Sequence, residues 1–202
     1  MKVTDVGLHN RLLDYPIREL AGKTMGIIGL GVLGRKVADI AKAFDMRVLA
    51  CERLGGNTTT LASNSHGDHI ERVPLDDLLQ TVDVLSIHCP LTPRTDSLIS
   101  TRELSLMKSS ALVINTARGA IVDSSALINA LETGEISGAG VDVLNLEPPT
   151  SDHPLITTKL PTLIVTPHNA WASIESRQRL VHQLADMLDA WQNGEPCNVV
   201  NP

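Results

Sequence analysis

The chain has 202 residues, of which 43% are apolar, so it is long enough to bury the core of one domain. A net charge of −6 argues against nucleic acid or an anionic membrane as a partner, and we expect neither. No apolar run reaches the length of a membrane span, the first five residues do not open a signal peptide, and the three cysteines are widely scattered. These features favour a reduced, cytoplasmic setting.

A glycine-rich turn follows the first predicted strand. Apolar residues at 26–28 lead into Gly29, Gly31 and Gly34 in the spacing G-x-G-x-x-G, and a helical pattern follows at 35–44. Strand, tight turn and helix together indicate a dinucleotide-binding fingerprint. Gly29 permits the turn, Gly31 leaves room for a pyrophosphate beside the backbone, and Gly34 lets the helix pack close to the strand. The helix N-terminus offers free N–H groups to the phosphates.

An acid lies at the end of the second predicted strand, 46–51. Glu52 follows Gly34 by 18 residues, and a carboxylate at this position accepts hydrogen bonds from the adenosine ribose and repels a 2′-phosphate. The alternative is an ordinary solvated acid. Arg53 beside it would accommodate a 2′-phosphate. The sequence therefore predicts NAD and leaves NADP open.

Strands and helices alternate over the rest of the chain. The polar stretch 55–70 predicts a surface loop, and we interpret its two histidines, His66 and His69, as an incidental cluster rather than a metal site. The other predicted helices are 74–79, 102–107, 124–133 and 172–191, and the other predicted strands are 82–88, 111–115, 138–143 and 162–165. This alternation predicts an α/β fold with a doubly wound parallel sheet, as in Rossmann domains.

Three side chains with useful chemistry follow three successive predicted strands: Arg118, Glu147 and His168. A guanidinium can hold a carboxylate through two hydrogen bonds, and an imidazole can exchange a proton with a carbonyl or hydroxyl oxygen. A neighbouring carboxylate stabilises an imidazolium. Taken singly, each residue has a structural explanation. Together with a nicotinamide that carries hydride, they would make a complete 2-hydroxyacid dehydrogenase.

From Leu20 to about Asn193 the chain resembles the D-isomer-specific 2-hydroxyacid dehydrogenases. The resemblance rests on the sequence NTARG at 115–119 with Val-Asp at 122–123, on a glutamate before a proline pair at 147–149, and on Pro-His at 167–168. The segments 166–172 and 177–179 most resemble the glycerate dehydrogenase (hydroxypyruvate reductase) branch.

The resemblance implies hydride transfer between NAD(H) and a small 2-hydroxy or 2-oxo acid, such as glycerate, hydroxypyruvate or glyoxylate. It implies that Arg118 binds the substrate, that His168 is the acid–base residue and that Glu147 is its acidic partner. It also implies cofactor contacts from the backbone amides of Val32 and Leu33, from Cys89, Pro90 and Thr95 on the adenosine side, and from Thr116, Ala117, Arg118, Asp142, His168 and Ala170 near the nicotinamide.

Members of this family carry roughly a hundred residues ahead of the cofactor domain, on the scale of a small domain. Here about 20 residues precede the first predicted strand. We therefore expect a short lead at 1–20, an NAD-binding domain at 21–171, and a helix and tail at 172–202 whose apolar face is exposed or used for self-association. A homodimer or a missing substrate-domain partner would cover that face. A non-catalytic NAD-binding module and an inactive fragment are the alternative functions.

Overall fold

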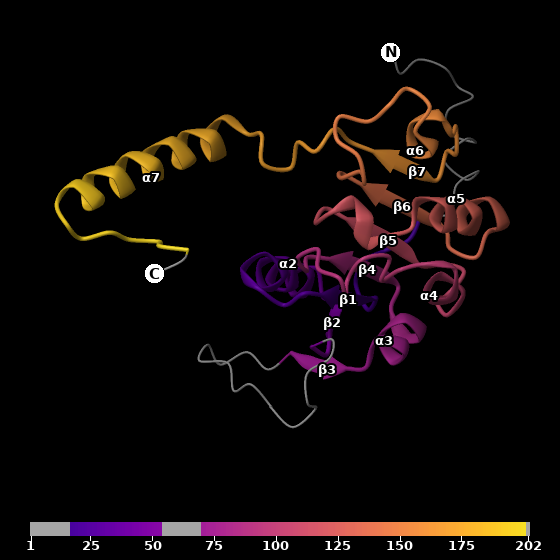
Figure 1. The fold of residues 1–202 in the computed structure, drawn as a ribbon. Helices are drawn as coiled ribbons and strands as arrows, with labels where there is room; N and C mark the ends of the chain where they lie inside the picture. The colour runs from indigo at the N-terminus through magenta and orange to yellow at the C-terminus, as the bar shows by residue number, and fades with distance from the viewer. Residues whose placement is uncertain (1–16, 54–69, 201–202) are drawn as a thin grey trace, which may run out of the picture.

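The computed structural model describes residues 17–53 and 70–200. In these ranges it contains one parallel sheet of seven strands with helices on both faces (Figure 1), which confirms the predicted doubly wound α/β fold. The strands lie in the order β3-β2-β1-β4-β5-β6-β7. Their bounds are β1 Thr24–Ile28, β2 Arg47–Cys51, β3 Glu71–Val73, β4 Val84–Ile87, β5 Leu112–Asn115, β6 Gly138–Val141 and β7 Leu163–Val165.

Helices connect most of these strands. They are α2 Val32–Ala43, α3 Leu75–Thr81, α4 Thr101–Ser105, α5 Ser124–Thr133, α6 Pro154–Thr157 and α7 Ile174–Gln192, with a short 3₁₀ turn η1 at Gly119–Ile121. Helix α5 has the bounds that the sequence predicts, because both ends are set locally. The Asp123 side chain accepts hydrogen bonds from the first-turn N–H groups of Ser125 and Ala126, and Gly134 ends the helix in a left-handed conformation.

The strand order reverses between β1 and β4. Strand β1 pairs with β2 on one side and with β4 on the other; the chain runs outward to β3 and then returns to β4 before continuing to β7. In open sheets of this kind, ligands bind beyond the carboxyl ends of the strands at such a reversal. The Gly29–Gly34 turn leaves β1 at this point.

The core is aliphatic and centres on β4, whose four residues are all buried. Leu85 and Ile87 of β4 pack in one cluster with Leu78 of α3 and Leu127 of α5. Strands that are covered by helices on both faces have no polar side to present, which explains the unbroken apolar runs in the sequence.

Three short elements were not predicted: the 3₁₀ turn η1, strand β3 and helix α6. Strand β3 is a charged edge strand of three residues, held against β2 by its ladder and by an ion pair between Arg47 and Glu71 at 2.9 Å. Helix α6 has a single turn. The predicted loop at 55–70 and its two histidines lie almost wholly outside the described residues.

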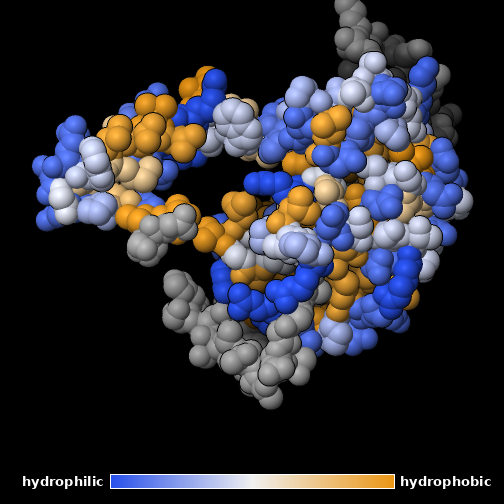
Figure 2. All heavy atoms as spheres, viewed as in Figure 1, coloured by the Kyte–Doolittle hydropathy of each residue, from blue (hydrophilic) through white to orange (hydrophobic). Residues whose placement is uncertain are grey.

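Helix α7 extends away from the sheet (Figure 1) and contributes no buried residue. Apolar side chains lie along it, and Figure 2 shows them as an exposed surface, as the sequence predicts for this segment. They include Leu180, Val181, Leu184, Leu188 and Trp191. The domain boundary at residue 171 stays a prediction. In the described part of the chain, no helix is both long and apolar enough to cross a bilayer.

Candidate active site

The candidate site lies along one edge of the sheet. Because all the strands are parallel, the segments that follow β1, β2, β4, β5, β6 and β7 leave from the same edge. Every residue that the sequence analysis singled out for binding or chemistry lies in one of these segments or at the start of α2.

The glycines after β1 have the three different environments that the fingerprint requires. Gly29 has a φ of 95°, and a Cβ there would lie 2.4 Å from the backbone nitrogen of Cys89, so the turn packs directly on the segment after β4. A Cβ on Gly34 would lie 2.3 Å from the Gly29 carbonyl oxygen. A Cβ on Gly31 would meet no atom within 4 Å. The space at Gly31 is therefore open toward the sheet edge.

Helix α2 begins next to this space. Its N-cap is Gly31, no side chain caps its first turn, and the Val32 and Leu33 side chains are 81% and 70% exposed. Helix N-termini of this kind bind phosphate through backbone N–H groups and the helix dipole. The residues present therefore fit a dinucleotide pyrophosphate. Glu52, half-buried directly after β2, and the exposed Arg53 lie at the position expected to distinguish NAD from NADP.

The segment after β4 is braced by Thr95. This buried hydroxyl donates to the Pro90 carbonyl at 2.7 Å and accepts from the Thr92 N–H at 2.7 Å. Cys89 is buried and Pro90 is exposed. Thr95 therefore fixes the conformation of this segment, and Pro90 is exposed on it and accessible to a ligand.

Arg118 lies on a turn that a buried side chain of β5 holds in place. Asn115 is 1% exposed; its amide nitrogen donates to the Arg118 carbonyl at 3.0 Å, and its amide oxygen accepts from the Ala117 N–H at 3.0 Å. Thr116 and Arg118 are exposed on this turn. The Arg118 guanidinium donates to the Ala117 carbonyl at 2.6 Å through one of its nitrogens. Its other donors remain able to hold a carboxylate.

The Arg118 turn packs on the segment after β6. A Cβ on Gly119 would lie 2.0 Å from the backbone carbon of Leu144 and 2.3 Å from the nitrogen of Asn145, so only glycine allows this approach. Glu147 follows two residues later. The two turns that carry Arg118 and Glu147 are therefore in direct contact.

His168 and Glu147 form an ion-pair geometry, with 2.6 Å between His168 Nδ1 and Glu147 Oε2. The other carboxylate oxygen of Glu147 accepts from the Leu144 N–H at 2.7 Å. The hydrogen bonds from Leu144 and then from His168 hold the pKa of Glu147 below its ordinary value, despite the opposing effect of burial. Because a carboxylate can only accept, His168 carries a proton on Nδ1, and Nε2 is the ring atom left to exchange a proton with a ligand.

Asp142 anchors the segment that carries His168. This buried carboxylate directly after β6 accepts hydrogen bonds from the Thr166 hydroxyl and from the N–H groups of Asn169 and Ala170, each of the latter at 3.1 Å. Burial alone would raise the pKa of Asp142, but these three hydrogen bonds and the nearby His168 outweigh it and lower the pKa. His168 itself has a φ of 49°, which is unfavourable for a residue with a Cβ. The bonds on both sides of it hold this conformation.

Comparison with known proteins shows the family of this domain. Residues 5–170 match the model of the D-isomer specific 2-hydroxyacid dehydrogenase, NAD binding domain. The chain belongs to this family. The fold class, the resemblance and the NAD cofactor predicted from the sequence are thereby confirmed.

Individual relatives agree with the family. The chain is 46% identical over 187 residues to the glycerate dehydrogenase of Methylorubrum extorquens, which covers 93% of this chain and 55% of the relative. It is 38% identical to the hydroxypyruvate reductase of Blautia hydrogenotrophica, covering 93% and 56%. Among solved structures, D-lactate dehydrogenase with NAD⁺ from Lactobacillus jensenii superposes with a TM-score of 0.81 at 30% identity, covering 98% of this chain and 63% of that one. The chain spans about half the length of the curated relatives it matches.

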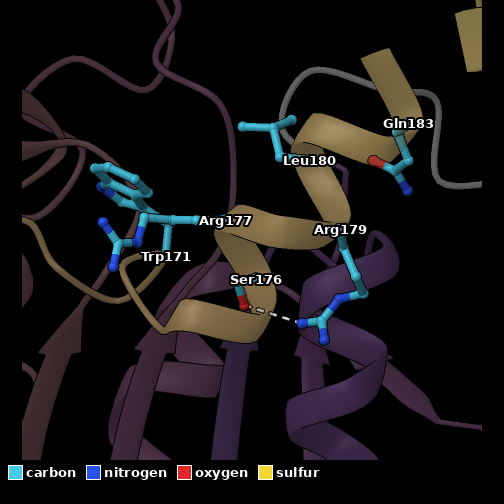
Figure 3. A pocket seen from close by; sticks show the side chains of 6 residues that line it. All are labelled: Trp171, Ser176, Arg177, Arg179, Leu180 and Gln183. Atoms are coloured by element: carbon cyan, nitrogen blue, oxygen red, sulfur yellow. Dashed lines mark hydrogen bonds between the residues drawn. The ribbon is translucent and has the colours of Figure 1, made fainter. Parts of the chain in front are cut away.

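An open hollow lies at the start of α7 (Figure 3). Arg177 and Trp171 project to one side of the helix there, whereas Arg179 extends to the other side and donates to the Ser176 hydroxyl at 2.9 Å. Arg177 and Arg179 belong to the segment that resembles the glycerate dehydrogenase branch of the family. The hollow is lined by Trp171, Ser176, Arg177, Arg179, Leu180 and Gln183.

The sequence did not predict the structural roles of several residues that shape this site: Asn115, Gly119 and Thr166, which lie within the quoted motifs, and Leu144, Asn145 and His153. They act through buried hydrogen bonds or close backbone approach, which leave no periodic signal. The position of Asn115 at the end of a buried strand was the available clue, because a polar side chain there needs a partner. In the described ranges, no group of three or more His, Cys, Asp or Glu side chains is arranged to hold a metal ion.

The Asp142 anchor predicts a pH-dependent loop. Because the pKa of Asp142 is lowered in the folded protein, its stabilising effect is complete above the ordinary carboxyl pKa and is lost as pH falls through the lowered value. We expect the amide NMR signals of Asn169 and Ala170 to titrate together below that ordinary range. Asp142→Asn should shift both signals at neutral pH, whereas Asp152→Asn, a matched exposed carboxyl, should leave them in place. If the amide signals of Asn169 and Ala170 shift neither with pH nor in Asp142→Asn, Asp142 does not anchor this segment.

Proposed function

We propose that this chain binds NAD(H) and provides the acid–base and substrate-binding residues for oxidoreduction of a small 2-hydroxy or 2-oxo acid. The observation that carries the proposal is the His168–Glu147 pair at 2.6 Å, next to the turn of Arg118, on the cofactor edge of a dehydrogenase-family sheet. Glycerate with hydroxypyruvate, or glyoxylate, is the proposed substrate class, because the relatives named above include a glycerate dehydrogenase and a hydroxypyruvate reductase. The three free cysteines in the described ranges support a reducing, cytoplasmic setting.

The roles of the side chains follow from their hydrogen bonds. Arg118 holds the substrate carboxylate through its guanidinium. The Nε2 atom of His168 donates a proton to the substrate carbonyl oxygen in reduction and takes it back in oxidation. Glu147 keeps Nδ1 protonated and stabilises the imidazolium. When bound, the nicotinamide of NAD(H) supplies or accepts the hydride.

The cofactor is held by the segments that the sequence singled out. The N–H groups of Val32 and Leu33, beside the open space at Gly31, bind the pyrophosphate. Glu52 accepts from the adenosine ribose, and Cys89, Pro90 and Thr95 border the adenosine. Thr116, Ala117, Arg118, Asp142, His168 and Ala170 border the nicotinamide.

Glu52 sets the cofactor preference. A carboxylate at the end of β2 meets a 2′-phosphate with like charge, so NAD(H) should bind at least about tenfold more tightly than NADP(H), which corresponds to about 1.4 kcal/mol. Glu52→Gln should narrow this difference, and Arg53→Gln, the matched neighbouring change, should widen it. Calorimetry with both cofactors measures these affinities. Equal affinities in the wild-type chain would mean that Arg53 dominates.

His168 and Arg118 should differ in their kinetic effects. His168→Ala removes the acid–base group and should lower kcat with hydroxypyruvate or glyoxylate and NADH by about 10²–10⁴. Arg118→Ala should mainly raise KM, because the carboxylate loses its guanidinium. His182→Ala is the control, because His182 is an exposed histidine of α7 that the proposal gives no role. A rate equal to that of the wild type in His168→Ala would remove His168 from the mechanism, and cofactor binding without any turnover would favour a non-catalytic NAD-binding module.

We further propose that the apolar face of α7 pairs with a second copy of the chain. Ile174, Val181, Leu184, Leu188 and Trp191 recur at spacings of three, four and seven, which is the pattern of helices that pack on helices. The positions that flank this stripe between Val181 and Trp191, Ala185 and Met187, are uncharged, and Arg177, between Ile174 and Val181, is the one charged side chain in line with it. This face buries nothing within the described part of the chain.

Self-association should depend on this stripe. Light scattering of the wild-type chain should give the mass of a dimer, and the double change Leu184→Glu with Leu188→Glu should give a monomer, because two charges would enter an apolar contact. Asp186→Asn, on the opposite face of the same helix, should leave the dimer intact. A wild-type monomer would show that the face of α7 meets a different partner, such as a substrate domain.

A further inference from the structure

His153 lies outside the residues that touch a ligand in the proposed function, yet its ring is fully engaged. It is 6% exposed and lies at the N-cap of α6. Its Nδ1 lies 3.2 Å from the Leu155 backbone nitrogen and its Nε2 lies 2.7 Å from the side-chain oxygen of Asn145. A backbone N–H only donates and an amide oxygen only accepts, so Nδ1 accepts and Nε2 carries the proton. The two contacts therefore assign one neutral tautomer to His153.

Asn145 lies inside the turn that presents Glu147. The ends of this turn are joined by the hydrogen bond from the Leu144 N–H to Glu147 Oε1, at 2.7 Å. Asn145, which His153 contacts, therefore directly follows Leu144, the donor of that hydrogen bond. Leu144, at the start of the turn, packs against the hydrophobic core, whereas Asn145 and Leu146 are exposed, so apolar packing holds only the first residue of the turn.

The turn is held from a second direction by Gly119, whose α-carbon lies against the backbone of Leu144 and Asn145. This contact sets the spacing between the turns of Arg118 and Glu147. It pushes on the backbone and cannot stop the turn from moving outward. A hydrogen bond from His153 to Asn145 restrains that outward motion.

We propose that His153 is a positioning residue, which holds the 144–147 turn through Asn145 and thereby aims Glu147 at the imidazole of His168. The chain of contacts runs from the Leu155 N–H through the His153 ring to Asn145, across the turn to Glu147, and on to His168. The inference rests on the proposed function for its meaning in catalysis, but the positioning itself is a property of the free chain.

The test uses two variants that cut the same contact from opposite sides. Asn145→Leu removes the acceptor on an exposed residue, and His153→Asn keeps an oxygen that can cap α6 but cannot reach Asn145. His153→Gln retains an N–H that reaches toward Asn145 and serves as the rescue. Thr157→Val removes a hydroxyl that bonds to the His153 carbonyl in α6 without touching Asn145, and it is the matched control.

The first readout is the pKa of Glu147, followed by carboxyl ¹³C NMR titration of the full chain and assigned with Glu147→Gln. Asn145→Leu and His153→Asn should raise it toward the ordinary glutamate value, because the bonds from Leu144 and His168 are weakened. His153→Gln should restore part of the lowering, and Thr157→Val should change nothing. A pKa of Glu147 that is the same in Asn145→Leu, His153→Asn and the wild type would overturn the proposal.

The second readout is kinetic. If the wild type turns over, Asn145→Leu should lower kcat about tenfold with little change in KM, because misplacement of a reacting group affects the chemical step more than binding. Absence of wild-type turnover would count against the proposed function and leave the NMR result to decide the positioning. If the wild type turns over and Asn145→Leu has the same kcat, the positioning role of His153 is wrong.

Discussion

The parallel direction of all the described strands is the constraint on which the site depends. It delivers the carboxyl end of every strand to one edge, so residues that lie far apart in the sequence meet there without any specific pairing between them. Arg118, Glu147 and His168 follow β5, β6 and β7, which are neighbours in the sheet. The close approach of Gly29 to Cys89 adds the segments after β1 and β4 to the same edge. The proposed cofactor region and the His168–Glu147 pair are thus consequences of one topology.

Topology brings the loops together, but buried polar side chains fix their shapes. Asn115 closes the Arg118 turn, Asp142 collects the donors of the His168 segment, and His153 restrains the Glu147 turn through Asn145. Each of these groups is buried, so leaving one of its hydrogen bonds unformed would destabilise the folded chain by about 1–3 kcal/mol. That cost makes the loop geometry stable before any ligand arrives. The unfavourable backbone of His168 is tolerated for the same reason, since the contacts around it over-determine the conformation.

The sequence could predict the features that depend on local patterns of residues. The glycine spacing, the apolar runs and the cap and stop of α5 give the fold class and most of the elements, and strand ends identify Arg118, Glu147 and His168 as candidates. The edge strand β3 could not be predicted, because two of its three residues, Glu71 and Arg72, are charged and it forms a strand only through pairing with β2. Helix α6 is likewise too short for periodicity. Asp142 was expected to face the nicotinamide, and its hydrogen bonds to the segment of His168 could not be read from a sequence because their donors lie 24 to 28 residues away.

The geometry of the His168–Glu147 pair is also independent of α7. The anchors of the His168 segment end at Ala170, whose N–H is held by Asp142, and α7 begins at Ile174 with no side chain buried against the sheet. His168 is therefore placed by the β6 side of the sheet, whatever surface α7 packs on. Trp171, in contrast, lies three residues before α7 and Arg177 lies near its N-terminus, and both line the hollow at the start of that helix. Within one continuous segment, the groups proposed to move a proton are therefore held by the sheet, whereas α7 beyond them buries no side chain.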